Sequence, residues 1–291
     1  MVVHRRIQRG FVLVLVLMVL AISASVLAIA ARRSGGRALA AGRALADLQL
    51  RWGSQSCRRT CLPQAERLLR QARSPDKAPV ATVRRTIKLG GIEFDLIVAD
   101  EQAKADVNAV AHRQKMAGVE TLLRALQTGR RVLPVRLRPA PPPAHVIAAV
   151  PVQLASYDQL YSIEHPSVLI EAGEVAPAIQ RVTCWAGGKL NLSRAEPIVI
   201  EQALAGLLTR TQVARLEALR RAKPGAPLEQ MVREMELTRE QAQALAPWVT
   251  ATSTCHSLWV IASDGRRRFY QLDVDQAGDA QNDSQHWSFR W

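Results

Sequence analysis

The sequence FVLVLVLMVLAISASVLAIAA, residues 11–31, decides how this chain is organised. It contains no charged residue, and only Ser23 and Ser25 interrupt its apolar run. Twenty-one residues at about 1.5 Å each make a helix of about 31 Å, which matches the hydrocarbon thickness of a bilayer. We therefore predict a transmembrane helix from Phe11 through Leu15 to Ala31.

The composition of the chain excludes several classes of protein. The chain has 291 residues and is 48% hydrophobic, which is enough for a globular core and excludes a chain disordered throughout. Four cysteines are too few for a disulfide-framework protein. No second stretch is long and apolar enough to cross a bilayer, so a polytopic membrane protein is also excluded.

Three interpretations compete for the N-terminus. A cleaved secretory signal has an apolar core of about 7–15 residues, shorter than this run, although Ala28-Ile29-Ala30 offers a cleavage triplet. An uncleaved membrane anchor is the second interpretation. The third treats residues 1–10 as a basic leader that is removed at the Arg9-Gly10-Phe11 junction, where glycine lets an extended backbone enter an active site. The basic leader favours a cytoplasmic N-terminus, although Arg32 and Arg33 weaken the charge asymmetry.

Residues 32–72 are predicted to continue the membrane helix as an amphipathic helix, with an interruption at Gly35-Gly36. Apolar residues recur there at near-helical spacing, at Leu39, Leu45, Leu48 and Trp52. A solvated juxtamembrane helix attracted to acidic lipid fits this segment equally well.

The four cysteines suggest two disulfides, Cys57–Cys61 and Cys184–Cys255. Residues four apart on a helix have Cβ atoms about 5–6 Å apart, beyond the ~3.8 Å of a disulfide, so the first bridge needs a distorted turn. Free buried thiols are the alternative. Metal binding is less favoured because the C-x-x-C spacing of zinc sites does not occur.

Residues 80–100 are predicted to form the first strands, two β-branched runs around Gly90-Gly91. Oxygen-bearing side chains come next at Asp100, Glu101, Asp106 and Asn108, which raises the question of calcium. The spacing is not that of an EF-hand loop, so we favour Asp100 as a turn cap and Asn108 as a loop tie. No metal or other cofactor is assigned.

Residues 157–247 are predicted to be mostly helical, and they belong to a subdomain predicted to span residues 101–247. A basic, proline-rich stretch at 129–144 is typical of an exposed, stiff connector outside the core, and it lacks the aromatic residues that stack on bases. Four short helices are predicted after it, at 199–208, 211–221, 228–235 and 239–245, with Thr211 and Thr238 as N-caps. Their connectors lack the glycine hairpin that would meet phosphate, so protein packing is favoured over DNA contact.

Residues 248–291 return to a strand pattern. Strands are predicted at 248–252, 258–262 and 267–274, the last two joined by an Asp264-Gly265 turn. A further edge strand is predicted at 286–289.

Taken in order, these features resemble the K-type minor pseudopilins of the type II (general) secretion pathway. The Arg9-Gly10-Phe11 junction resembles a type IV prepilin signal, with Leu15 where most pilins carry glutamate. Further points of similarity are the strand that runs into Asp100-Glu101-Gln102 and Asn108, the segment 188–195 with Asn191, and a terminal strand pair. The connector departs from the family, which is acid-rich in this region, so no calcium ligand is carried over.

The resemblance implies an α+β, pilin-like fold: a long N-terminal transmembrane helix, a small antiparallel sheet and a large inserted helical subdomain. It implies cleavage between Gly10 and Phe11 by a prepilin peptidase, with N-methylation of Phe11. It also implies a non-catalytic subunit at the tip of a pseudopilus that supports export of folded proteins across the outer membrane. Such a subunit is held in the inner membrane by one helix, has its C-terminal domain in the periplasm, and has other minor pseudopilins as partners.

Two other classes of function compete with this one. The net charge of +14 suggests a membrane-anchored protein with a helical nucleic-acid- or protein-binding module, but the surplus lies mostly beside the membrane helix and in the connector. Nucleic acid is therefore not predicted as a partner. An enzyme has little support, because the sequence holds no histidine metal pair, Gly-x-Ser-x-Gly elbow or P-loop.

Overall fold

The computed structural model describes residues 4–72, 79–127, 132–139, 153–171, 174–263, 268–278 and 284–291. The chain divides into two compact units, one ending at Trp52 and the other starting at Gly53. Each unit is described by itself below.

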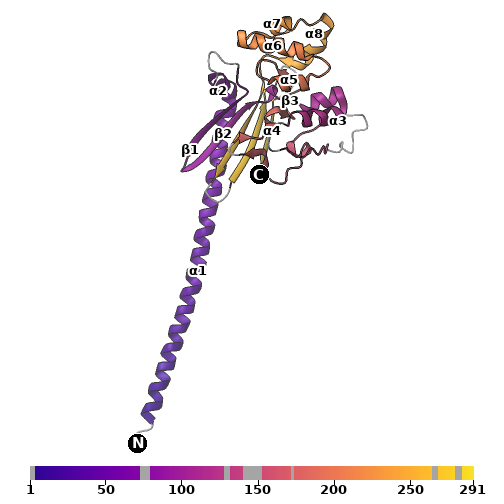
Figure 1. The fold of residues 1–291 in the computed structure, drawn as a ribbon. Helices are drawn as coiled ribbons and strands as arrows, with labels where there is room; N and C mark the ends of the chain where they lie inside the picture. Colours follow the sequence, from indigo (N-terminus) through magenta and orange to yellow (C-terminus); the bar gives the residue numbers. More distant parts are fainter. Residues whose placement is uncertain are drawn as a thin grey trace. The chain divides into compact units, whose positions relative to one another are not determined.

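The first unit is formed by helix α1 up to Trp52. The helix begins at His4 and ends at Cys61, so its last nine residues belong to the second unit (Figure 1). The predicted interruption at Gly35-Gly36 is wrong, because the helix is continuous there. The neighbouring alanines and leucines are strong helix formers and offset the cost of two glycines, about 1 kcal/mol each. Within the described residues this is the one helix long and apolar enough to cross a membrane.

The second unit is built on a five-stranded antiparallel sheet with the order β1-β2-β9-β10-β11 (Figure 1). The strands are β1 (Thr82–Leu89), β2 (Ile92–Asp100), β9 (Cys255–Ser263), β10 (Arg268–Gln276) and β11 (Gln285–Arg290). Gly90 and Gly91 join β1 to β2, and both have positive φ, 57° and 84°. This two-residue turn is the type that matches the twist of a hairpin and favours glycine. The predicted edge strand at 286–289 is confirmed as part of β11.

The helical subdomain is inserted between β2 and β9, which are neighbours in the sheet. Its helices are α3 (Val107–Ala125), α4 (Pro177–Arg181), α5 (Pro197–Ala203), α6 (Arg210–Ala222), α7 (Leu228–Glu234) and α8 (Arg239–Leu245). Two-residue strands and 3-10 turns connect them, namely η2 (Glu101–Ala103), β3 (Ala105–Asp106), η3 (Tyr157–Gln159), η4 (Pro166–Leu169), β4 (Ile170–Glu171), β5 (Glu174–Val175), β6 (Val182–Thr183), β7 (Leu190–Asn191), η5 (Ala246–Trp248) and β8 (Val249–Thr250).

The two faces of the sheet pack against different elements. The helix face carries Phe94, Leu96 and Val98, and Phe94 packs against Gly53 near the end of α1. The turn η1 (Leu62–Gln64) and helix α2 (Ala65–Gln71) continue this layer. The core face carries Ile97 and Trp259, which belong to the large apolar cluster shared with the inserted helices.

Several local predictions need correction. The N-cap of α6 is Thr209, not Thr211: the Thr209 hydroxyl accepts from the Gln212 N–H and completes a capping box. The strand predicted at 248–252 shrinks to β8, which pairs with β7 in a separate small sheet. Part of the connector lies outside the described residues, but its described segment 132–139 is not a free spacer, because Leu133 is buried in the core. The Asp264-Gly265 turn also lies outside the described residues.

Candidate functional site

The predicted processing junction lies within α1. Gly10 and Phe11 are both helical, and the side chains of Phe11 and Leu15 are exposed, as is Ala31 at the end of the apolar stretch. An apolar helix surface of this kind needs lipid or another helix to cover it. Cleavage and methylation at Gly10-Phe11 remain predictions.

The motif residues lie together where the inserted subdomain leaves and rejoins the sheet. Asp100, at the end of β2, is fully buried. Its Oδ1 accepts hydrogen bonds from the backbone N–H groups of residues 102 and 103, at 2.9 and 3.2 Å, and from Ser253 Oγ at 2.6 Å. Its Oδ2 accepts from Asn191 Nδ2 at 2.9 Å and from Arg194 Nη1 at 3.0 Å. One carboxylate therefore joins three segments that are far apart in sequence.

Arg194 extends this network to the helix layer. Its Nη1 and Nη2 donate to the two carboxylate oxygens of Glu66, on α2, at 2.7 and 2.9 Å. Glu66 also contacts His256 Nε2 at 3.2 Å and Arg70 Nε at 2.7 Å. Burial alone would raise the pKa of Glu66, but the hydrogen bonds from His256, Arg194 and Arg70 outweigh it and hold that pKa well below its usual value. We call Glu66, Asp100, Asn191, Arg194, Ser253 and His256 the junction cluster.

Glu101 and Gln102, which come directly after Asp100, make further buried contacts. Glu101 Oε1 accepts from Lys104 Nζ and from Ser257 Oγ, both at 2.5 Å. Gln102 donates to the Ala186 carbonyl at 3.0 Å and accepts from the Thr254 N–H at 2.9 Å. The contacts with Thr254 and Ser257 join the start of the inserted subdomain to the beginning of strand β9.

Asp106 and Asn108 fix the start of helix α3, a few residues after the turn η2. Asp106 caps α3 by accepting from the N–H groups of residues 108 and 109, and its Oδ2 accepts from the Gly188 N–H at 2.8 Å. Burial raises the pKa of Asp106 despite these hydrogen bonds. Asn108 donates to the carbonyls of Leu154 and Cys184, both at 2.9 Å, and accepts from the Leu154 N–H at 2.8 Å. The structure shows the predicted roles of Asp100, which caps the turn η2, and of Asn108, which ties a loop, and it adds Asp106 as the cap of α3.

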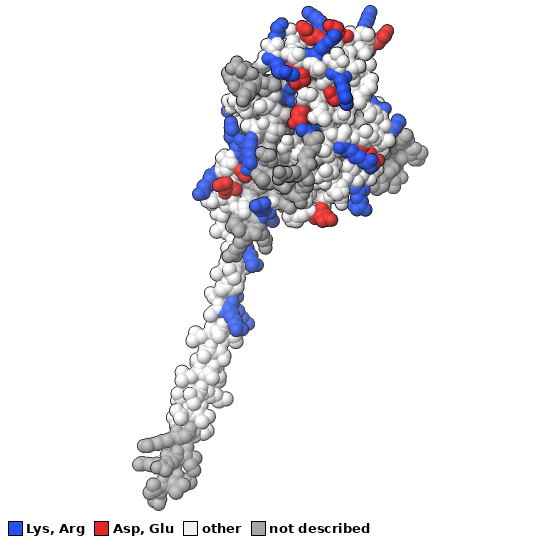
Figure 2. Space-filling model, in the orientation of Figure 1, with Lys and Arg blue, Asp and Glu red and all other residues white. Residues whose placement is uncertain are grey.

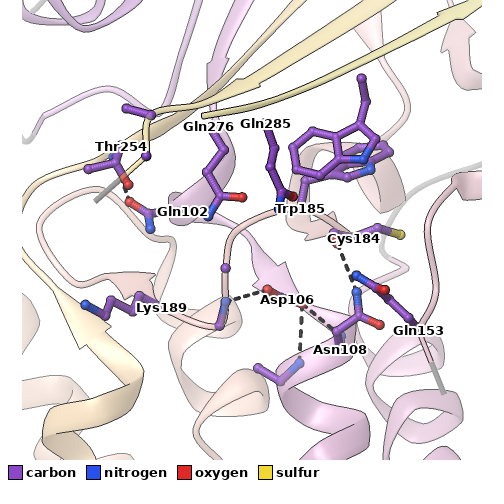
Figure 3. Close-up of a pocket in the computed structure, with 16 residues that line it drawn as sticks. Gln102, Asp106, Asn108, Gln153, Cys184, Trp185, Lys189, Thr254, Gln276 and Gln285 are labelled. Atoms are coloured by element: carbon purple, nitrogen blue, oxygen red, sulfur yellow. Dashed lines mark hydrogen bonds between the residues drawn. The ribbon is translucent and has the colours of Figure 1, made fainter. Parts of the chain in front are cut away.

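A polar cavity of about 440 Å³ adjoins these residues. Gln102, Asp106 and Asn108 form part of its wall, and Trp185 forms another part (Figure 3). Figure 3 shows the side chains of Gln276 and Gln285 reaching from the strands toward the same space.

The structure supports neither a metal centre nor a thiol nucleophile among the residues that it describes. No group of three or more His, Cys, Asp or Glu side chains is placed to hold a metal ion there, and both Asp100 oxygens accept from donors of the protein itself. All four cysteines are free, so the structure gives no support to Cys57–Cys61 or Cys184–Cys255, and both bridges stay predictions. Burial raises the pKa of Cys57 to about 11 and those of the other three cysteines as well.

Sequence reasoning missed most of the junction cluster. The sequence motifs include Asp100 and Asn191, but no pattern gives a role to Glu66, Arg194, Ser253 or His256. A signal is present for Arg194, since it lies three residues after Asn191 in the motif segment 188–195. Glu66 carries one local signal, Arg70 four residues further on, but its partners Arg194 and His256 are more than one hundred residues away in the chain.

Comparisons with protein-family models and with curated proteins give no match. Among solved structures, the chain is similar to a chain in the crystal structure of the GspK-GspI-GspJ complex from the type 2 secretion system of enterotoxigenic Escherichia coli. The TM-score is 0.51 at 15% sequence identity, and the match covers 86% of this chain and 99% of that chain. This likeness confirms the predicted fold class: the chain has an α+β, pilin-like fold with a long apolar N-terminal helix and an antiparallel sheet.

Proposed function

We propose that the chain is a minor pseudopilin of a type II secretion system. Its apolar helix anchors it in the inner membrane, with the C-terminal unit in the periplasm. A prepilin peptidase removes residues 1–10, and Phe11 becomes the methylated N-terminus. The mature chain then joins other minor pseudopilins at the tip of a pseudopilus that supports protein export, and it has no catalytic role of its own.

The observation that carries the proposal is the fold likeness over 86% of the chain to a member of the GspK-GspI-GspJ complex. The two sequences are only 15% identical, so the similarity lies in the arrangement of helix, sheet and insertion. The order of the sequence motifs supports the same function independently.

The part of α1 beyond the spanning stretch gives further support. Residues 32–52 add about 31 Å of helix. An apolar stripe runs along it at spacings of three and four residues, at Ala38, Ala41, Leu45, Leu48 and Trp52. Leu45, Leu48 and Trp52 are 56%, 50% and 59% exposed. This spacing is the pattern that packs helix against helix, as assembly into a filament requires.

Two of the five basic residues of the same segment lie opposite the stripe, whereas Arg37 borders it, four residues before Ala41. Arg32 and Arg43 project from the side of the helix opposite the stripe, as the 100° rotation per residue requires. Figure 2 shows basic side chains gathered on one side of this part of the helix. An apolar stripe bordered by few charged residues suits a helix that packs on other helices.

Leu15 supports a position at the tip. In pilins the glutamate usually found here pairs with the N-terminal amine of the subunit ahead, according to the family resemblance. A subunit with Leu15 offers no such acid, and the topmost subunit has no amine ahead of it to neutralise.

The test is the N-terminus of the membrane-extracted protein. Co-expression with a prepilin peptidase should shorten the chain by ten residues and leave one methyl group on Phe11, as read by intact mass and terminal sequencing. Gly10→Glu should abolish both changes. Gly42→Glu is the matched control, since nothing lies within 4 Å of that glycine, and it should be processed normally.

Two results would contradict the proposal. A product that begins near Arg32 would show ordinary signal cleavage. An intact N-terminus in the presence of active peptidase would show a plain anchor.

A further inference from the structure

The five-stranded sheet has two outer strands among the described residues, β1 and β11, and they differ in protection. Outer strands that must stay unpaired usually carry charged residues. β1 does so, with exposed basic side chains at Arg84, Arg85 and Lys88. β11 has the sequence QHWSFR and carries one such residue, Arg290, among aromatic and polar ones. The outer edge of β11 therefore has few of the charged side chains that usually prevent pairing with another strand.

The hydrogen-bond register shows which backbone groups of β11 are open. Trp291, directly after the strand, exchanges both backbone hydrogen bonds with Tyr270, at 3.0 and 3.4 Å. Bonded and non-bonded pairs alternate in an antiparallel ladder, so every second residue before Trp291 also turns its backbone toward β10. The residues between them point their N–H and C=O groups away from the sheet, and these are the exposed His286, Ser288 and Arg290.

The side chains of β11 give this edge a distinct chemistry on each face. On the core face, Trp287 and Phe289 are half-buried, and Phe289 stacks on Trp291 with ring centroids 6.1 Å apart. On the helix face lie His286 and Arg290. His286 already has two carboxylates of β10 within 4.0 Å, whereas Arg290 has no ion pair among the described residues.

The polar cavity lies at the beginning of the same strand. Gln285 and Trp287 of β11 form part of its wall, together with Gln276 and the exposed Lys189 (Figure 3). Its volume of about 440 Å³ leaves room for a side chain of a segment that runs beside β11.

We propose that the open edge of β11 binds an extended polypeptide segment as a sixth strand. One face of that segment carries apolar side chains, which pack beside Trp287 and Phe289. The other face carries acidic side chains, at least one of which pairs with Arg290. The outward backbone groups of three residues supply the affinity, and the two faces supply the specificity. The surface is a property of the sheet, so it stands whether or not the chain is processed as proposed above.

The test uses the full chain in detergent and a fluorescein-labelled, amidated heptapeptide in which aspartate and valine alternate. Fluorescence anisotropy should show binding that weakens as salt is raised. Hydrogen exchange should slow at the amides of His286, Ser288 and Arg290 when the peptide is present. A heptapeptide of alternating lysine and valine should bind at least about tenfold more weakly.

Two proline variants isolate the edge. Ser288→Pro removes an outward N–H without touching the ladder to β10, and should weaken peptide binding at least about tenfold. Thr86→Pro is the matched control on the other outer strand. The Asp100 N–H donates to the Ala81 carbonyl, so by the same alternation the backbone N–H of Thr86 points away from β2. It should leave peptide binding unchanged.

Arg290→Glu keeps the proposal testable even if the proline variant does not fold. This variant should reverse the preference, so that the lysine peptide binds more tightly than the aspartate peptide. Equal binding of both peptides, equal loss in both proline variants, or absence of binding by the folded wild-type chain would overturn the proposal. Self-association of the chain through β11, seen as protection of the same three amides without peptide, would also overturn it by making a second copy the occupant.

Discussion

Substitution of Arg194 tests the junction cluster most directly. Arg194 is 8% exposed, and its guanidinium makes three charge-assisted hydrogen bonds, two to Glu66 and one to Asp100. Arg194→Met keeps most of the apolar length of the side chain and removes all three. Asp100 is then left fully buried without its one cationic partner.

The expected cost depends on the donors that remain around each carboxylate. Loss of one partner from a buried ion pair typically costs about 3–5 kcal/mol. Asp100 keeps four other donors, and Glu66 keeps His256 and Arg70. We therefore expect the lower end of that range, a loss of about 3 kcal/mol in the free energy of unfolding.

Urea unfolding of the full chain in a mild detergent, followed by tryptophan fluorescence, measures this loss. Arg210→Met is the control, because Arg210 is 88% exposed and 3.7 Å from Glu201, and it should change stability by less than about 0.5 kcal/mol. In a double-mutant cycle, Arg194→Met and Glu66→Gln should couple by about 1 kcal/mol or more. A loss below about 1 kcal/mol for Arg194→Met, or no coupling, would refute the view that this cluster holds the subdomain to the sheet.

Three further predictions concern packing, a buried amide and pH. A Cβ atom at Gly53 would lie 2.2 Å from Phe94 Cζ, so Gly53→Ala should destabilise the second unit by about 1–2 kcal/mol in urea unfolding, whereas Gly42→Ala should be neutral or stabilising by up to about 1 kcal/mol. Asn108→Ala should lower the free energy of unfolding by about 2–3 kcal/mol, because three backbone groups lose their hydrogen-bond partner. The isosteric Asn108→Asp should lower it by at least as much. A loss below about 1 kcal/mol for both variants would contradict the role of Asn108 as a loop tie. Because the folded-state pKa of Glu66 lies below its unfolded value of about 4.3, its stabilisation is present above that value and is lost as the pH falls; unfolding free energies should decline between about pH 5 and pH 3, and less steeply in Glu66→Gln.

Much of the fold could be predicted because its strongest features are local. A charge-free run from Phe11 to Ala31 has one stable conformation in a bilayer, and Gly90-Gly91 between β-branched runs has one common turn. Prediction failed at the start of α6, where two threonines lie close together. Thr209 and Thr211 are both good caps, and only Thr209 has a glutamine three residues on, which completes the capping box.

The junction cluster could be predicted only in part, for a physical reason. Capping side chains such as Asp100 and Asp106 accept hydrogen bonds from backbone N–H groups two and three residues further on. Their pattern is therefore visible within a few adjacent residues of the sequence. Ion pairs such as Glu66–Arg194 depend on the topology that brings distant segments together, and a surface pair would have looked the same in sequence. The burial that gives such a pair its energetic weight is a property of the folded chain alone.

The location of the cluster is a consequence of the topology of the insertion. The chain leaves the sheet at Asp100 and returns at Cys255 in the neighbouring strand, so both ends of the inserted subdomain meet at one place. The hydrogen bond from Ser253 to Asp100 closes this loop, and Arg194 carries the same network to Glu66 on α2. The bidentate ion pair between Glu66 and Arg194 therefore joins the helix layer to the insertion at the place where Asp100 joins the insertion to the sheet, which a cluster within the subdomain alone would not achieve.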